Sequence, residues 1–336
     1  ARNHGGADNW GEAKILRSSN MGLQDHFGGA VAISGDTVAV GSPFDDGPPV
    51  NPVQGAGAVY VFARNQGGAG NWGETRVLYA HEMQIFDYFG WSVAIDGDTI
   101  VAGKVYADED GAGLLDNSGA AYVFARNHGG AGNWGEVQVL RASDPGSMDW
   151  FGGSVAISGD TVVIGAYQED GGAGDPLADA GAAFVYSRND GVWQEAAIRR
   201  ASDLQPMDQL GYSVAVDGGT LVVGAPGEDG GAGDPLAEAG AAYVFYRNLG
   251  GAENWGEARI LRASDAQAQD WFGNSVAVSG DTVIVGAYLE DGGAGDPVSD
   301  AGAAYVFGRN QGGADNWGQV QVLRKGDPKI DDYFGC

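Results

Sequence analysis

Carboxylates that recur at regular spacing are the residues in this sequence best suited to chemistry. One Asp stands two residues before a recurring Phe-Gly pair, and another stands nineteen residues after it, on a glycine-rich segment. Carboxylate and carbonyl oxygens on such a segment are the hard ligands that Ca²⁺ takes. The sequence therefore predicts candidate calcium ligands at Asp46, Asp108, Asp149, Asp170, Asp179, Asp208, Asp229, Glu238, Asp270, Asp291 and Asp300.

A turn role is the alternative for the same carboxylates. Asp is favoured in turns because its side chain accepts hydrogen bonds from nearby backbone amides. The spacing matches no established calcium loop, so both interpretations stay open for acids such as Asp170. Like charges in adjacent loops are costly unless a cation or a basic partner compensates them, and this favours calcium as a ligand.

Tryptophan and arginine also recur in each copy of the pattern. One set of tryptophans is present in every copy, which indicates packing, because large aromatic side chains dominate core energetics. This set is Trp10, Trp72, Trp134, Trp193, Trp255 and Trp317. Trp150 and Trp271 do not recur in every copy, and they are the candidate ligand contacts. The recurring arginines Arg64, Arg126, Arg188, Arg247 and Arg309 are expected to satisfy hairpin carbonyls or the carboxylate of a neighbouring sheet.

Catalysis finds little support in the sequence. None of the four histidines pairs with a recurring nucleophile, and the sequence contains no GxSxG, HExxH or phosphate-binding loop. Carboxylate pairs for glycoside hydrolysis stay open as an alternative, because the sequence does not give their separation. We expect no enzyme.

A single unit repeats along the whole chain. Phe27, Phe89, Phe151, Leu210, Phe272 and Phe334 each precede a glycine, at intervals of 62 residues, or 59 between the third and the fourth. A fixed period of this length is typical of solenoids and propellers. The predicted repeats are 27–88, 89–150, 151–209, 210–271 and 272–333. Residues 1–26 are expected to end a preceding repeat and to supply its last strand, and 334–336 to begin a further one.

Each repeat contains four short segments with the composition of β-strands. In the third repeat these are 154–157, 161–164, 182–187 and 193–198, separated by turns rich in Gly, Asn and Asp. No segment has helical periodicity. Four antiparallel strands per repeat predict an all-β propeller, in which the acidic loops and the connections between blades gather at one end.

The repeat resembles the FG-GAP repeat, the blade of the integrin α-subunit propeller and of many bacterial extracellular proteins. The FG is Phe151-Gly152, and the GAP is clearest at 224–226, whereas Gly103-Lys104-Val105 departs most. The resemblance implies six or seven blades in the parent protein and a non-catalytic, extracellular or cell-surface role in recognition or adhesion. The integrin-type calcium loop is absent, so that site is not transferred to Asp36, Asp98, Asp160 or Asp281. The alternatives are a structural subunit of an extracellular fibre or repeat array, and a carbohydrate-active enzyme.

Composition limits the partners. The chain has 45 acidic and 18 basic residues among 336, and its net charge of −27 disfavours nucleic acid and anionic lipid. No apolar run is long enough for a membrane-spanning helix. The single cysteine, Cys336, excludes an internal disulfide. The expected partners are a protein or carbohydrate ligand, or a second copy joined through open blade edges, and a segment carrying any export signal is expected to precede residue 1.

Overall fold

The computed structural model describes residues 11–20, 22–108, 117–172, 174, 176–231, 233, 235–293 and 298–336. These residues form five sheets of four antiparallel strands and no helix, as the sequence predicts. The first sheet consists of β1 (Ala30–Ser34), β2 (Thr37–Ser42), β3 (Ala58–Arg64) and β4 (Trp72–Leu78). The second consists of β5 (Phe89–Asp96), β6 (Thr99–Lys104), β7 (Ala120–Arg126) and β8 (Trp134–Leu140).

The remaining three sheets repeat the same order. The third contains β9 (Ser154–Ser158), β10 (Thr161–Ala166), β11 (Ala182–Asn189) and β12 (Val192–Arg199). The fourth contains β13 (Ser213–Asp217), β14 (Thr220–Ala225), β15 (Ala241–Tyr246) and β16 (Gly256–Leu261). The fifth contains β17 (Phe272–Ser279), β18 (Thr282–Ala287), β19 (Ala303–Arg309) and β20 (Trp317–Leu323). We call the five sheets blades 1 to 5.

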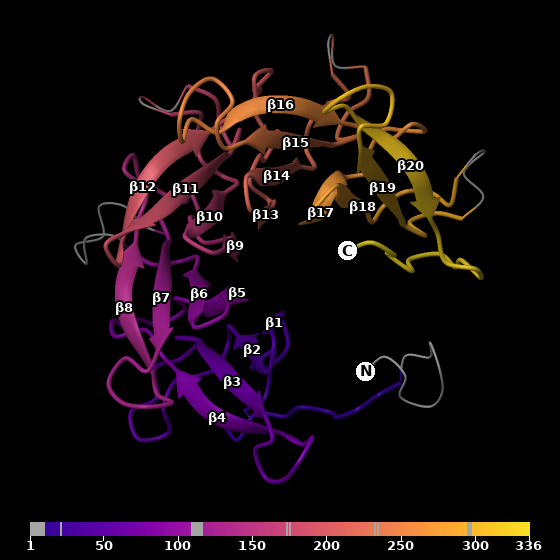
Figure 1. Ribbon diagram of the computed structural model, residues 1–336. Coiled ribbons are helices and arrows are strands. Elements are labelled where there is room, and N and C mark those ends of the chain that lie inside the picture. The colour runs from indigo at the N-terminus through magenta and orange to yellow at the C-terminus, as the bar shows by residue number, and fades with distance from the viewer. Residues whose placement is uncertain are drawn as a thin grey trace.

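The blades are arranged around a common axis, as in a propeller. Figure 1 shows the first strand of every blade on the inner side of an arc and the fourth strand on the outer side. In the described part of the chain the arc stays open between blade 1 and blade 5. Within each blade every strand pairs with the next one along the chain, and a tight turn such as Ser158-Gly159-Asp160 joins the first strand to the second.

The core lies between neighbouring blades, not within one of them. Val101 and Val123 of blade 2 belong to the same buried cluster as Phe151, Ile164 and Phe184 of blade 3. Because both faces of an inner blade are covered in this way, its second strand is buried throughout, as in β10 and β14. Burial of these faces is the main favourable term that holds the arc together.

The Phe-Gly pair fixes each blade against the one before it. Phe89 donates its backbone N–H to Ala56 O at 3.0 Å, and a parallel bridge joins Phe89 to Gly57. The next carbonyl, Gly90 O, lies so close to Gly41 on β2 that a Cβ at position 41 would overlap with it. Glycine is therefore required where the two backbones approach one another.

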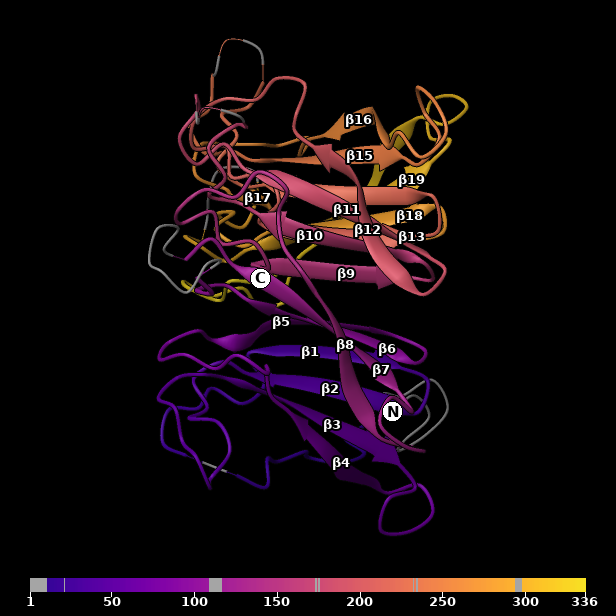
Figure 2. The ribbon, with the colours of Figure 1, turned by 90° about the vertical axis from the view of Figure 1, so that its left-hand side faces the viewer.

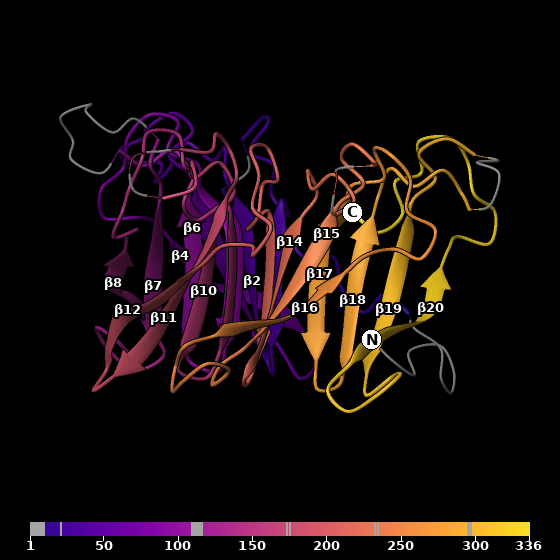
Figure 3. The same cartoon turned by 90° about the horizontal axis from the view of Figure 1, so that it is seen from above.

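The long connections and the tight turns emerge at opposite ends of the arc. Figure 2 and Figure 3 show the loops after the second and fourth strands at one end, and the hairpin turns at the other. We call these the loop end and the turn end.

The strand predicted within residues 1–26 does not form in the described residues 11–20 and 22–26. A strand needs a neighbouring strand to satisfy its backbone groups. This segment instead packs Leu16 against the apolar side chains of blade 1 and donates from Ser19 to Glu74. The described part of the chain also contains no helix that could cross a lipid bilayer.

Candidate functional site

All the predicted metal ligands lie at the loop end, where the connections of adjacent blades meet. The acidic loop of blade 3 is joined to the connection that enters blade 4, because Met207 N donates to Ala178 O at 2.9 Å and Gln209 N donates to Asp179 O at 3.1 Å. Equivalent bonds join the loop of blade 4 to the entry of blade 5. The loop end is therefore a continuous backbone-bonded surface that the blades hold in place.

The aspartates two residues before the Phe-Gly pair are buried turn residues. Asp149, Asp208 and Asp270 are each only 3% exposed. Each accepts a hydrogen bond from the backbone N–H three residues earlier, at 2.6, 2.7 and 2.8 Å respectively. The turn role considered for these carboxylates is thus present in the structure.

The aspartates nineteen residues after the pair close the acidic loops. Asp170 Oδ1 accepts the backbone N–H of Asp179 at 2.8 Å, and Asp229 Oδ1 accepts that of Glu238 at 2.8 Å. The same bond across nine residues occurs at Asp46, Asp108 and Asp291. Asp179 and Glu238 lie at positive φ, 51° and 53°, where the loop turns back. Among the described residues, which leave out the middles of several loops, no group of three metal-ligating side chains could hold an ion.

Three partly buried ion-pair groups lie beside these loops, and the sequence analysis did not find them. Arg200 Nη2 contacts the buried Glu169 at 2.5 Å and Asp144 at 3.0 Å. Blades 4 and 5 repeat the group as Arg262 with Glu228 and Asp203, and as Arg324 with Glu290 and Asp265. The signal in the sequence is a recurring Arg-Ala-Ser-Asp segment after the fourth strand, as at 200–203 and 262–265. Its arginine belongs to the ion-pair group of one blade, and its aspartate belongs to the group of the next blade.

The buried turn aspartates differ in how their charge is compensated. Burial is the main cause that raises the pKa of Asp208 to about 7; the Gln205 amide lowers it, and the nearby Glu228 and Asp203 carboxylates contribute to the rise. Asp270 has the same kind of environment, with Glu290 and Asp265 nearby, and a pKa of about 7. In blade 2 burial also raises the pKa of the corresponding Asp87, but the buried Lys104 at 2.7 Å lowers it. Lys104 occupies the alanine position of the GAP segment, so this departure supplies the counter-charge.

Aromatic side chains form a continuous row along the loop end. We call it the aromatic arc. Ring contacts cross every blade junction, with centroid distances of 4.6 Å for Phe44–Tyr88, 5.2 Å for Tyr106–Trp150 and 5.0 Å for Tyr167–Tyr212. Most of these rings are half-buried. The members are His26, Phe44, Tyr88, Tyr106, Trp150, Tyr167, Tyr212, Trp271, Tyr288 and Tyr333.

The predicted ligand contacts Trp150 and Trp271 both belong to the aromatic arc. They occupy the position directly before the Phe-Gly pair, at φ values of 57° and 55°. Such values are rare for a bulky residue, and the equivalent residues His26 and Tyr88 share them, at 53° and 55°. Trp271 Nε1 donates to Glu238 Oε2 at 3.1 Å, so a ring and an exposed carboxylate stand side by side.

The tryptophans that begin the fourth strands pack as predicted. Trp134, Trp193, Trp255 and Trp317 are at most 3% exposed, whereas Trp72 is half-buried and Trp10 lies outside the described residues. A recurring arginine stacks on each of the five described rings, as Arg126 does on Trp134 at 4.7 Å. Of the two predicted partners of these arginines, a carboxylate on a neighbouring blade is wrong for the pairs that the structure describes. Arg126 and Arg188 pair with Asp98 and Asp160 of their own blades, because the tight turn before the second strand lies beside the end of the third.

Comparison with known families decides what these blades are. The FG-GAP repeat matches residues 10–62, 72–124, 134–186, 193–245 and 255–307. The chain belongs to the FG-GAP repeat family. The FG-GAP matches from residue 72 onward begin at or next to the fourth strand of one blade and end in the third strand of the next, so the family unit spans a blade junction. FG-GAP propellers are typically non-catalytic. No curated protein matches the chain.

Replacing the turn aspartates tests the role of their charge. A carboxyl whose pKa is higher in the folded than in the unfolded state destabilises the fold as the pH rises from about 4 to about 7. Asp208→Asn keeps an acceptor for Gln205 N–H and removes this loss. We expect it to stabilise the protein by roughly 1–3 kcal/mol at pH 8 and to flatten the pH dependence, as measured by chemical denaturation.

Asp87→Asn is the matched variant with the opposite expected sign. It leaves the buried Lys104 ammonium without its carboxylate, so we expect a loss of about 3 kcal/mol at the same pH. Destabilisation of similar size in both variants would contradict this assignment of the charges.

Proposed function

We propose that this FG-GAP chain is a non-catalytic recognition module of the cell surface or extracellular space, and that its loop end binds a protein or carbohydrate ligand. The observation that carries the proposal is the aromatic arc. Half-exposed rings in contact across every blade junction offer an extended stacking surface, and aromatic side chains dominate the energetics of binding surfaces.

The surroundings of the arc favour a ligand with many hydrogen-bond donors. Exposed carboxylates such as Glu238 stand beside the rings and accept hydrogen bonds from hydroxyl or ammonium groups. A hollow of about 350 Å³ opens at the blade 1 end of the arc, lined by His26, Phe44 and Phe86 together with the carboxylate Asp46. Neutral sugars and basic peptide segments fit this combination, whereas the net charge of −27 repels acidic polymers.

Calcium is a proposed stabiliser of the loop end. Burial raises the pKa of Asp179, and the charge of the nearby Asp170 raises it further. The loops of blades 3, 4 and 5 each have two such carboxylates, whose mutual repulsion a cation would relieve, with backbone carbonyls nearby. The carboxylates that would hold it are Asp170, Asp179 and their counterparts Asp229 with Glu238 and Asp291 with Asp300.

A structural subunit of a repeat array is the second candidate, because apolar side chains on the two terminal blade faces are exposed among the described residues. Val31 and Ile33 of β1 are 67% and 65% exposed, whereas their counterparts Val93 and Ile95 on β5 are 9% exposed. At the other end Ile284 of β18 is 39% exposed. The four internal junctions show that such faces pack against another blade, so a second copy is a fitting partner for them.

Removing single rings from the arc tests the recognition proposal. A glycan array and a panel of extracellular proteins would first identify a ligand of the parent chain. Trp150→Ala and Trp271→Ala are then expected to weaken binding roughly tenfold each, because each ring contributes on the order of 1–2 kcal/mol of contact. Val192→Ala, an exposed residue on β12 away from the loop end, is the matched control. Unchanged affinity in both tryptophan variants would overturn the proposal.

Thermal unfolding with millimolar calcium against excess chelator tests the cation proposal. A ligand that binds only the folded state raises the melting temperature by mass action. We expect such a rise in the parent chain and its loss when Asp170, Asp229 and Asp291 are changed together to Asn. The absence of any calcium-dependent shift in the parent chain would contradict the proposal and leave these acids as loop-closing residues.

A further inference from the structure

Each connection that enters a blade contains an exposed residue with a left-handed backbone. This residue stands three positions before the recurring Phe-Gly or Leu-Gly pair, and its φ lies between 61° and 72° in every copy. We call these the entry residues, and they are Gln24, Phe86, Met148, Met207, Gln269 and Asp331. Residues other than glycine seldom adopt such values, and Asn and Asp do so more readily than bulky residues.

Three successive entry residues are large and apolar although they are exposed to solvent. Phe86, Met148 and Met207 are 46%, 50% and 54% exposed. In other copies a polar residue, such as Gln24 or Gln269, occupies the same place with the same backbone. The fold therefore does not need an apolar side chain here, and these three residues combine an unfavourable backbone with little burial. Such a combination indicates contact with another molecule.

Further apolar side chains are exposed beside the entry residues at the loop end. The residue directly before the entry residue is aliphatic in three copies, with Leu23 100%, Ile85 64% and Ile330 69% exposed. Phe86 also lines the hollow at the blade 1 end of the aromatic arc, and its ring centroid lies 6.1 Å from that of Tyr88. The apolar entry residues therefore border the aromatic arc and extend its apolar surface.

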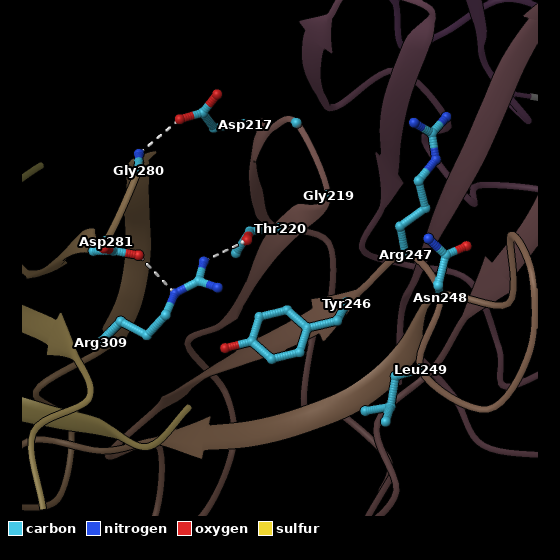
Figure 4. A pocket seen from close by; sticks show the side chains of 11 residues that line it. Asp217, Gly219, Thr220, Tyr246, Arg247, Asn248, Leu249, Gly280, Asp281 and Arg309 are labelled. Carbon is cyan, nitrogen blue, oxygen red and sulfur yellow. Dashed lines mark hydrogen bonds and ion pairs between the residues drawn. The ribbon is translucent and has the colours of Figure 1, made fainter. Parts of the chain in front are cut away.

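The turn end has a different surface. Figure 4 shows polar side chains bonded to one another in the hollow there, with Arg309 bonded to both Asp281 and Thr220. Leu249 is 43% exposed at this end, but it has no apolar equivalent in blades 1, 2 and 5. Single exposed apolar residues are normal on protein surfaces, whereas a group of them marks an interaction surface.

Carboxylates lie beside the apolar entry residues. The backbone N–H groups of Phe86 and Met207 donate, both at 2.9 Å, to the acidic loops of blades 1 and 3, which Asp46 and Asp170 close. Among the described residues, no lysine or arginine forms an ion pair with either aspartate. Basic side chains of a partner would complement these charges, in keeping with the net charge of −27.

We propose that the three apolar entry residues, together with Asp46 and Asp170, form a docking surface for a protein segment in which apolar side chains alternate with lysine or arginine. This inference rests on the proposed recognition function and names the chemistry of the partner. Methionine side chains adapt to apolar partners, whereas they offer a sugar only a weak hydrogen-bond acceptor. The neighbouring carboxylates repel an anionic membrane.

Fluorescence anisotropy of labelled peptides titrated with the full chain tests the surface. The probes are a peptide of alternating leucine and lysine and a peptide of alternating serine and lysine. Excess chelator is present so that calcium does not compete for the aspartates. We expect the leucine–lysine peptide to bind roughly tenfold or more tightly, because its apolar contacts add to the same charge. Equal affinity for the two peptides would overturn the proposal.

The triple variant Phe86→Asn, Met148→Asn and Met207→Asn locates the contact. Asparagine tolerates the left-handed backbone, so we expect its melting temperature to equal or exceed that of the parent chain. We also expect it to bind the leucine–lysine peptide roughly tenfold or more weakly, and the serine–lysine peptide as before. Unchanged binding of the leucine–lysine peptide, or a large fall in melting temperature, would overturn the proposal.

A matched control changes comparably exposed apolar residues on the outer strands β8, β12 and β20, and we expect it to bind both peptides as the parent chain does. Its substitutions are Val137→Thr, Val192→Thr and Val320→Thr. An equal loss of leucine–lysine binding in this control would overturn the assignment to the entry residues.

The ligand that the glycan array and the protein panel identify separates this inference from the recognition role. A carbohydrate that binds Trp150→Ala and Trp271→Ala weakly, and the triple variant normally, would leave the recognition role intact and overturn the inference. A protein ligand that loses affinity in the tryptophan variants and in the triple variant would support both. Unchanged affinity in all of them would contradict both.

Discussion

The close approach of two backbones at each blade junction is the contact on which the rest of the structure depends. From Phe89-Gly90 onward, the glycine carbonyl of each recurring pair lies against a glycine on the second strand of the preceding blade. The same carbonyl accepts a serine hydroxyl from the preceding first strand at three junctions, for example Ser154 Oγ to Gly211 O at 2.7 Å. Hydrogen bonding satisfies the buried oxygen, so the junction is tight without an unpaired polar group.

Because the junction is fixed, equivalent residues of successive blades lie next to one another. The same side-chain contacts therefore recur from blade to blade at both ends of the arc. At the loop end the junction brings one ring per blade into contact with the next, so single aromatic residues become a row. At the turn end it sets each arginine beside the threonine of the blade before it. A different residue in one blade then changes a local ion pair without changing how the blades pack. Lys104 provides a counter-charge for Asp87, and Gly219 leaves Arg247 paired with Glu253 in place of a turn aspartate.

The sequence predicts the strands and tight turns well because local sequence patterns determine them. Alternating β-branched segments and Gly-containing turns locate the strands of blade 3, and the observed β9 to β12 differ from the predicted ranges by only one or two residues at their ends. The burial of the recurring tryptophans follows from the same repetition. The strand expected in residues 1–26 does not form in the described part of that segment, because pairing requires a partner strand, which no local pattern supplies.

Most of the candidate site could not be predicted, because its partners are far apart in the chain. Arg200 lies 31 residues from Glu169 and 56 from Asp144, and spacing alone does not show that they meet. The positions of the loop aspartates were predictable, but their nine-residue closing bonds depend on how each loop folds back. Gly219 stands in an ordinary turn sequence. Only comparison with the arginines of the other four blades, which pair with turn aspartates, shows that Arg247 pairs with Glu253.

Replacing the glycine at one junction measures the central contact directly. At Gly224 a Cβ would overlap with the carbonyl oxygen of Gly273, whereas at Gly326 it would meet nothing within 4 Å. We expect Gly224→Ala to lower the free energy of unfolding by about 3 kcal/mol or more, and Gly326→Ala to change it by less than about 0.5 kcal/mol. Equal, small effects of the two substitutions would contradict the view that backbone contact at glycine holds the blades together.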